Sequence, residues 1–339
     1  MELKKTILEL SAKTGVSGEE DAALQYAFEC LKKYTDDCYI KNGNVVGNFG
    51  ERSSDKPHIL LDAHIDQVGL IVTHIFESGF LGISNVGGID RRLLPAQKVM
   101  IHGKKDIFGV ICSVPPHLSS DEKKVNKIDE FYVDTAMSFE KVSEIVRCGD
   151  KISFISEPKE LMGGSITGCA LDDRSGIAAL LYAAELLKDD KPDCSYSILF
   201  SAQEELGERG AAIGAFDIDP DIAIAVDVSF GRCQNDKESE TGEMGKGPMI
   251  GISPSLSREL SDKLESICKE QEIPWQPEVM SGLTSTNADR FSVNKCGCKT
   301  CTVSIPLRYM HTPAEAIKIK DVENTGRLIA AYIRSFKNV

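Results

Sequence analysis

Two short polar motifs, each at the end of an apolar, strand-like run, carry side chains that could hold a metal ion. They are Ala63-His64-Ile65-Asp66 and Gln203-Glu204-Glu205. His64 and Asp66 lie two residues apart, so their side chains share a face of an extended chain. One of them can bind a metal ion while the other orients it. The alternative is a core histidine beside a capping aspartate.

Glu204 and Glu205 are adjacent, which restricts where they can act together. Neighbouring side chains on a regular strand point to opposite faces. Both can face one site only where a strand ends, and Gly207 close behind them indicates such an end. One carboxylate could then bind a metal ion while the other takes a proton from a bound water. A solvated acidic turn is the alternative.

Three more residues fit the same chemistry. Asp172 precedes a helical pattern and could bridge two cations, although an N-cap is the alternative, and Asp173 could supply that cap. Asp227 lies within an apolar strand-like run, where a carboxylate is costly unless it is paired or metal-bound. His311 follows the last strand-like run, in a loop. Two imidazoles with several carboxylates suit zinc, cobalt or manganese, so the sequence predicts a metal-dependent hydrolase.

Apolar strands alternate with amphipathic helices in the parts of the chain that carry these motifs. This alternation predicts a mixed sheet with helices on both faces, an α/β fold. Asn42-Gly43 predicts a hairpin turn, and Ser17-Gly18-Glu19-Glu20 predicts a capping box with Ser17 as the N-cap of the next helix. The strands are expected over 58–61, 196–201 and 222–228, and the helices over 3–13, 174–187, 208–216, 255–271 and 321–336.

Residues 70–160 have a different pattern, with short strands and many glycines. We interpret them as an inserted, mainly β domain with a loop over 115–127. The catalytic domain would then be discontinuous and consist of residues 1–69 and 161–339. A length of 339 residues suits two domains.

The composition restricts the class of partner. A net charge of -13 argues against nucleic acid or an anionic membrane surface as the main partner. The N-terminus lacks the apolar core of a signal peptide, and no apolar run approaches the ~18 residues of a membrane span. The 11 cysteines are scattered, which fits reduced thiols in a cytoplasm. We interpret the cluster over 296–301 as small hydrophobic side chains, with a zinc or iron–sulfur site as the alternative.

Taken in order, the five motifs resemble those of the di-metal cytoplasmic aminopeptidases of the tetrahedral aminopeptidase and glutamyl aminopeptidase type. Some relatives of that type are labelled cellulase or endoglucanase. The resemblance covers nearly the whole chain. It implies a di-zinc exopeptidase-like domain interrupted by a PDZ-like dimerisation domain. It also implies two divalent metal ions per subunit, short peptide substrates, and dimers that assemble into a dodecamer.

The same resemblance assigns a role to each candidate residue. Zinc or cobalt is the metal it favours, with manganese as an alternative. It also implies a cis peptide bond between Asp172 and Asp173. The resemblance implies that Asp172 bridges the two metals. It implies that His64 and Asp227 bind one metal and that Glu205 and His311 bind the other. Glu204 would be the general base and acid, and Asp66 would brace His64.

Two positions depart from the family pattern, and rival functions stay open. Gln67 and Asn287 stand where acidic residues are common, and the second change bears on the substrate side chain. A glycoside hydrolase needs two free carboxylates and usually an aromatic platform, but Trp275 is the single tryptophan. The motifs are also compatible with a related deacylase or carboxypeptidase, and a non-catalytic scaffold would be favoured only if candidate ligands were missing.

Overall fold

The computed structural model describes residues 1–112 and 125–336, so most of the loop predicted over 115–127 lies outside the described residues. Within the described residues, the helices all lack the combination of length and apolarity needed to cross a membrane.

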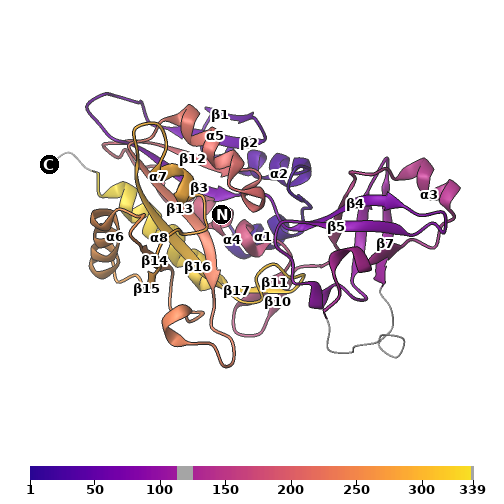
Figure 1. Cartoon of the computed structure of the whole chain (residues 1–339). Helices are drawn as coiled ribbons and strands as arrows, with labels where there is room; N and C mark the ends of the chain where they lie inside the picture. The colour runs from indigo at the N-terminus through magenta and orange to yellow at the C-terminus, as the bar shows by residue number, and fades with distance from the viewer. Residues whose placement is uncertain (113–124, 337–339) are drawn as a thin grey trace.

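A large mixed sheet forms the centre of the main body (Figure 1). Its eight strands run in the order β1-β2-β12-β3-β13-β16-β14-β15, and the four central strands from β12 to β16 are parallel. The strands are β1 (Cys38–Lys41), β2 (Asn44–Phe49), β3 (His58–His64), β12 (Ser195–Ser201), β13 (Ile222–Phe230), β14 (Met249–Ile252), β15 (Gln276–Val279) and β16 (Lys299–Leu307).

Helices cover both faces of this sheet, as the sequence predicts. Alternate residues of β3 contact different layers: Leu61 packs with the helices of one face and Leu60 with those of the other. Burying each such side chain contributes roughly 1.5–3 kcal/mol. One face carries α1 (Leu3–Ser11), α2 (Asp21–Leu31), α4 (Leu171–Leu187), α6 (Arg258–Glu270) and α8 (Ile319–Arg334), and the other carries α5 (Arg209–Ile218) and α7 (Ala288–Ser292).

The predicted β-rich insertion is a closed barrel with its own core, and it projects from the main body in Figure 1. Closure leaves no unpaired strand edge. The barrel order is β4-β5-β8-β7-β6-β9. Its elements are β4 (Gly69–Ile75), β5 (Leu81–Val86), β6 (Lys98–His102), β7 (Asp106–Cys112), β8 (Tyr132–Asp134), α3 (Phe139–Ile145) and β9 (Lys151–Phe154).

A small three-stranded sheet links two distant parts of the chain beside the main sheet. It contains β10 (Lys159–Leu161), β11 (Ser165–Gly168) and β17 (Glu315–Lys318). Its register places Gly168 opposite Glu315. The segment that leads to Asp172 therefore lies against the segment that follows His311.

Of the two turn predictions, the hairpin is confirmed and the capping box is wrong. Asn42 and Gly43 join β1 to β2 with φ of 53° and 79°, the conformation for which an Asn-Gly pair is suited. Helix α2 begins at Asp21, with Glu20 as the N-cap residue. The Ser17 hydroxyl instead donates to the buried carboxylate of Asp66, at 2.6 Å. An N-cap serine would accept a backbone N–H of the helix, whereas the buried carboxylate of Asp66 needs donors, and the Ser17 hydroxyl donates to it.

Candidate active site

The candidate residues gather at one edge of the large sheet because the parallel strands end there. His64 is the last residue of β3, and Glu204 follows β12. Asp227 lies near the end of β13, and His311 follows β16. Crevices outside the carboxyl ends of parallel strands are the usual ligand sites of α/β sheets. A cavity of about 340 Å³ lies here, and six of the seven predicted residues line it: His64, Asp172, Glu204, Glu205, Asp227 and His311.

Asp172 lies between the two histidines. Its Oδ1 is 2.9 Å from Nε2 of His64, and its Oδ2 is 3.3 Å from Nε2 of His311. Nε2 of His64 is also 3.8 Å from Oδ1 of Asp227, and Nε2 of His311 is 3.3 Å from Oε1 of Glu205. One carboxylate thus faces two separate groups of donor atoms.

The backbone at Asp172 and Asp173 departs from helical geometry at the start of α4. The peptide bond between them is cis, as the resemblance implies. The Asp173 carboxylate accepts the N–H of Gly176 at 3.0 Å and so caps the regular part of the helix. The capping role that was the alternative for Asp172 therefore falls to its neighbour, and Asp172 faces the cavity.

Glu204 and Glu205 face the same cavity because β12 has ended before them. The chain turns at Gln203, with φ of 55°, and forms a single 3-10 turn, Glu204–Leu206, that closes at Gly207 with φ of 98°. A side chain at position 207 would be strained at that φ. Among the described residues, no hydrogen bond or ion pair engages the Glu204 carboxylate, so it is free to act on a ligand.

Asp66 lies behind the cavity wall and supports two of its components. Its carboxylate accepts the N–H of Glu204 at 2.9 Å and that of Glu205 at 3.2 Å. Its Oδ1 also lies 3.4 Å from Nδ1 of His64. Although burial raises the pKa of Asp66, its contacts with His64 and Ser17 lower it overall, so the residue is a carboxylate that fixes the imidazole and the glutamate turn.

Glu315 is a buried residue of this site that the sequence interpretation missed. Its Oε2 accepts the N–H of Leu171 at 2.8 Å and that of Asp172 at 3.1 Å, and its Oε1 accepts the N–H of His311 at 3.0 Å. One side chain therefore ties the two segments that carry Asp172 and His311. The available signal was a carboxylate at the start of the apolar stretch Glu315-Ala316-Ile317, which resembles the context of Asp227.

The loop after β5 of the barrel approaches two side chains of the cavity at Gly87 and Gly88. A Cβ at Gly88 would lie 3.1 Å from Nδ1 of His311, and one at Gly87 would lie 3.3 Å from Oε2 of Glu205. These glycines allow the loop after β5 to approach the two side chains closely.

The electrostatics of the site require positive charge or protons. Burial raises the pKa of Glu204 to about 9 and that of Asp227 to about 8, and neighbouring carboxylates add to both shifts. Burial lowers the pKa of His311, but Asp172 and Glu205 raise it overall to about 11. Buried carboxylates at this density are stable only when paired, protonated or bound to cations.

The donor set fits divalent cations that accept nitrogen and oxygen ligands. Among the described residues, the atoms of three groups lie within 4.8 Å of one another, and one of these groups includes Asp173 in place of Asp172. None of the groups contains a cysteine, and in the cluster over 296–301 Cys301 is buried while Cys296 is exposed. The groups are Asp172, Glu205 and His311; His64, Glu204 and Glu205; and His64, Asp173 and Asp227.

Asn287 does not line this cavity. Its side-chain amide donates to Oδ2 of Asp62 at 2.7 Å and to the hydroxyl of Ser201 at 2.9 Å, and all three residues are buried. Any influence on the substrate side chain, expected from the departure at this position, would have to be indirect.

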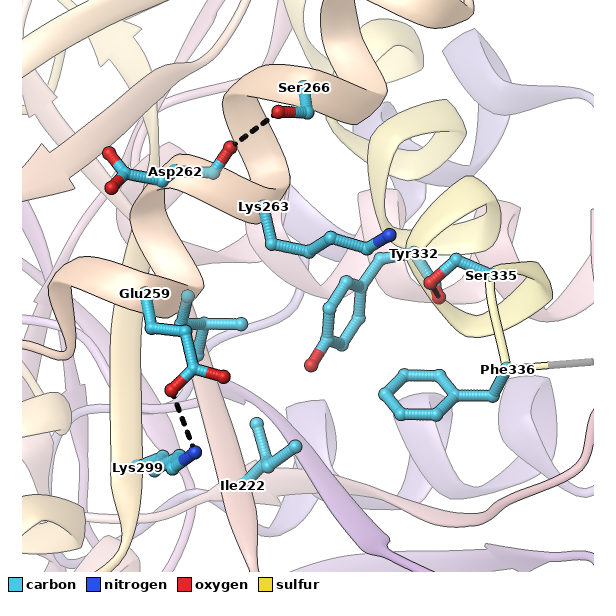
Figure 2. A pocket seen from close by; sticks show the side chains of 10 residues that line it. Ile222, Glu259, Asp262, Lys263, Ser266, Lys299, Tyr332, Ser335 and Phe336 are labelled. Carbon is cyan, nitrogen blue, oxygen red and sulfur yellow. Dashed lines mark hydrogen bonds and ion pairs between the residues drawn. The ribbon is translucent and has the colours of Figure 1, made fainter.

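A second cavity, of about 550 Å³, lies between α6 and α8 and shares no residue with the first (Figure 2). Figure 2 shows a surface ion pair between Glu259 and Lys299, 2.8 Å apart, beside the rings of Tyr332 and Phe336. Its lining lacks histidine and cysteine, so the side chains that suit a metal ion belong to the smaller cavity.

The α/β sheet, with imidazoles and carboxylates clustered at its carboxyl edge, has the fold and the side chains of a hydrolase. The chain belongs to the M42 glutamyl aminopeptidase family, which matches residues 43–328. It is therefore an aminopeptidase, a hydrolase that acts on peptide bonds.

The relatives match over almost their whole length. A lysyl aminopeptidase of Pyrococcus furiosus is 35% identical over 99% of this chain and 97% of its own. A TET aminopeptidase from a marine sediment thaumarchaeote superposes with a TM-score of 0.93 at 30% identity, over 98% and 96% of the two chains. The TET1 peptidase of Pyrococcus horikoshii, described as able to assemble into a tetrahedron or a large octahedral shell, gives 0.86 at 32% identity, over 98% and 99%.

Proposed function

We propose that this chain is a di-metal aminopeptidase that removes N-terminal residues from short peptides. The observation that carries the proposal is the position of Asp172, whose two oxygens face His64 and His311 separately. A carboxylate shared in this way suits a site for two cations.

The side chains that would hold the cations divide into two sets around Asp172. His64 and Asp227 would complete one set, and Glu205 and His311 the other. Bound cations would polarise the scissile carbonyl group and make a water molecule more acidic. Asp66 and Glu315 do not bind cations in this scheme; they hold the binding side chains in place through the contacts described above.

Glu204 carries the proton in the proposed reaction. Its carboxylate lines the cavity and has no partner in the described parts of the chain, so it can accept a proton from the attacking water and return it to the leaving amine.

The geometry favours peptide hydrolysis over glycoside hydrolysis. The carboxylates of the cavity are engaged with imidazoles, except for Glu204 and Glu278. Trp275 is not part of the cavity wall, so a tryptophan platform for a sugar is absent. The family match favours an aminopeptidase over a deacylase or carboxypeptidase, but the names of the relatives and of the family differ on the N-terminal residue that is removed.

We propose that the enzyme is an oligomer, in which dimers form through residues 70–160 and assemble into a dodecamer. The assembly described for the Pyrococcus horikoshii relative supports this proposal. A cytoplasmic location also stays a prediction. Light scattering at micromolar concentration should give a mass many times the 37.0 kDa of one chain, and a monomer would contradict the proposal.

The experiment that tests the function combines metal removal with an aminoacyl amide assay. Chelation should abolish hydrolysis of a panel of aminoacyl p-nitroanilides, and added zinc, cobalt or manganese should restore it. Elemental analysis should find two ions per subunit. Full activity in excess chelator, with no metal detected, would refute the proposal.

A further inference from the structure

Glu278 is a carboxylate of the cavity wall that the proposed cation sites do not use. It lies on β15, the outer strand of the large sheet, and its Oε2 accepts the hydroxyl of Ser304 at 2.6 Å. No ion pair engages it within the described part of the chain. Burial raises the pKa of Glu278, while the hydroxyls of Ser229 and Ser304 oppose the shift. Glu278 is half-buried, and a partly desolvated carboxylate without a cationic partner favours a cation close to it, so the wall is suited to receive one.

The strand register places this carboxylate close to the proposed reaction centre. Glu278 is paired with Gly251 on β14, and because Gly251 has no side chain, Glu278 can reach across that strand to Ser304 on β16. Ser304 is paired with Asp227 on β13. Since adjacent strands are about 4.8 Å apart, the Glu278 carboxylate lies roughly 5–8 Å from Asp227.

A second unpartnered oxygen lies in the same wall. Thr302 is fully buried, lines the cavity, and has an Oγ1 without a hydrogen-bond partner among the described residues. A Cβ at Gly251 would lie 2.0 Å from that oxygen, so the glycine provides the room over the strand. Thr302 and Ser304 point to the same face of β16. Together with Glu278 they offer three oxygen acceptors, which matches the three donors of an ammonium group.

We propose that Glu278 selects peptides whose N-terminal residue has a cationic side chain, lysine or arginine. This inference rests on the proposed aminopeptidase function. Met280 and Met310 also line the cavity and can pack along the methylene stem of such a side chain. A substrate with an acidic side chain would instead bring like charge to Glu278. An apolar one would supply no cation to Glu278 and no partner to the Thr302 hydroxyl.

The test compares lysyl and norleucyl p-nitroanilides on the metal-loaded enzyme. The two side chains have the same carbon stem, and only lysine carries the ammonium group. We expect kcat/KM to favour the lysyl substrate by at least tenfold, with arginyl also preferred over glutaminyl and glutamyl. Glu278→Gln should reduce the lysyl-to-norleucyl ratio by about tenfold or more. Glu259→Gln is the matched control, because this exposed glutamate pairs with Lys299 far from the cavity, and its ratio should equal that of the wild type.

Different results would overturn different parts of the argument. A preference of the wild-type enzyme for norleucyl or glutamyl substrates would refute the role of Glu278 and leave the aminopeptidase function intact. The same holds if Glu278→Gln keeps the wild-type ratio. Because the wild-type comparison is decisive alone, the proposal is tested even if the variant fails to fold. Failure of the metal-loaded enzyme to hydrolyse any aminoacyl substrate would refute the proposed function itself.

Discussion

Replacing each of the two adjacent glutamates separates proton transfer from cation binding. In Glu204→Gln, the backbone N–H bond to Asp66 remains, and the side chain keeps its size and loses no partner among the described residues. In Glu205→Gln, the 3.3 Å contact between a carboxylate and His311 is lost, together with the charge that a cation would need. The first variant should therefore lose proton transfer, and the second, one position further on, should lose cation binding.

The expected change in activity and metal content of each variant follows from these contacts. A positioned general base contributes about 10²–10⁴ in rate, so Glu204→Gln should lower kcat at least a hundredfold, which is about 3 kcal/mol in activation free energy. Its metal content should equal that of the wild type. Its metal-free form should unfold at a temperature no lower than the wild type, because one of several mutually repelling buried carboxylates is removed. Glu205→Gln should lose activity together with bound metal.

The measurement is kcat on one aminoacyl p-nitroanilide, with elemental analysis of the same gel-filtered samples. High concentrations of added metal should rescue Glu205→Gln in part and should not rescue Glu204→Gln. If Glu204→Gln loses metal while Glu205→Gln keeps it, the two roles are exchanged. If Glu204→Gln retains more than a tenth of wild-type kcat, the residue is not the base.

Two further predictions concern residues behind the cavity and within the sheet. Glu315→Gln should lower the free energy of unfolding by about 1–3 kcal/mol, since a carboxamide leaves at least one of three N–H groups unpaired, and two of these are buried. The same substitution should weaken metal affinity by about 10–100-fold. Thermal unfolding and chelator competition measure the two effects, and a metal affinity equal to that of the wild type would contradict the argument. Burial lowers the pKa of His58, which lies between two serine hydroxyls, from 6.5 to about 4. The unfolded chain therefore takes up the proton first as the pH falls, and the free energy of unfolding should drop between pH 6.5 and 4 by up to about 3 kcal/mol. Urea unfolding of the wild type and of His58→Asn at pH 7.5 and 5 tests this, and equal losses of stability in the two proteins would refute it.

The sequence predicts which side chains meet at the cavity, because their positions follow from local rules. His64, Glu204 and Asp227 each belong to a short apolar strand or follow one directly, and parallel strands bring their carboxyl ends to one edge. Two adjacent glutamates can face one cavity only where a strand ends. The turn between Gln203 and Gly207 provides that end. In each case the pattern in a few consecutive residues decides the geometry.

The supporting contacts of Ser17 and Glu315 could not be predicted in this way, because their partners are distant in sequence. Ser17 has the local signature of a helix cap, yet its hydroxyl bonds to Asp66, 49 residues away. Glu315 meets the backbone of Leu171 and Asp172 only through the register of the small sheet, at a separation of more than 140 residues. Such strand registers are set by tertiary packing and cannot be recognised in a short stretch of sequence.

The glycines of the barrel illustrate the same limit. Their density predicts short strands and an inserted β unit, and the structure confirms both. The closed strand order depends on pairings between distant strands, such as that of Leu70 with Ile152, and the approach of Gly88 to His311 joins segments that are still further apart in sequence. A glycine that is needed for close approach looks, in sequence, like any turn glycine.

The arrangement of the sheet also suggests why catalysis and side-chain selection can be altered separately. Asp227, Ser304 and Glu278 lie on β13, β16 and β15, and the side chain of Glu278 spans the intervening β14 above Gly251. In our proposal the carboxylates near the imidazoles are neutralised by cations, whereas Glu278 keeps its charge for the substrate. Because Ser304 stands between the two groups, a change at position 278 alters the charge of the outer wall and leaves the contacts of Asp227 in place. Selectivity should therefore change with position 278 while the ions remain bound.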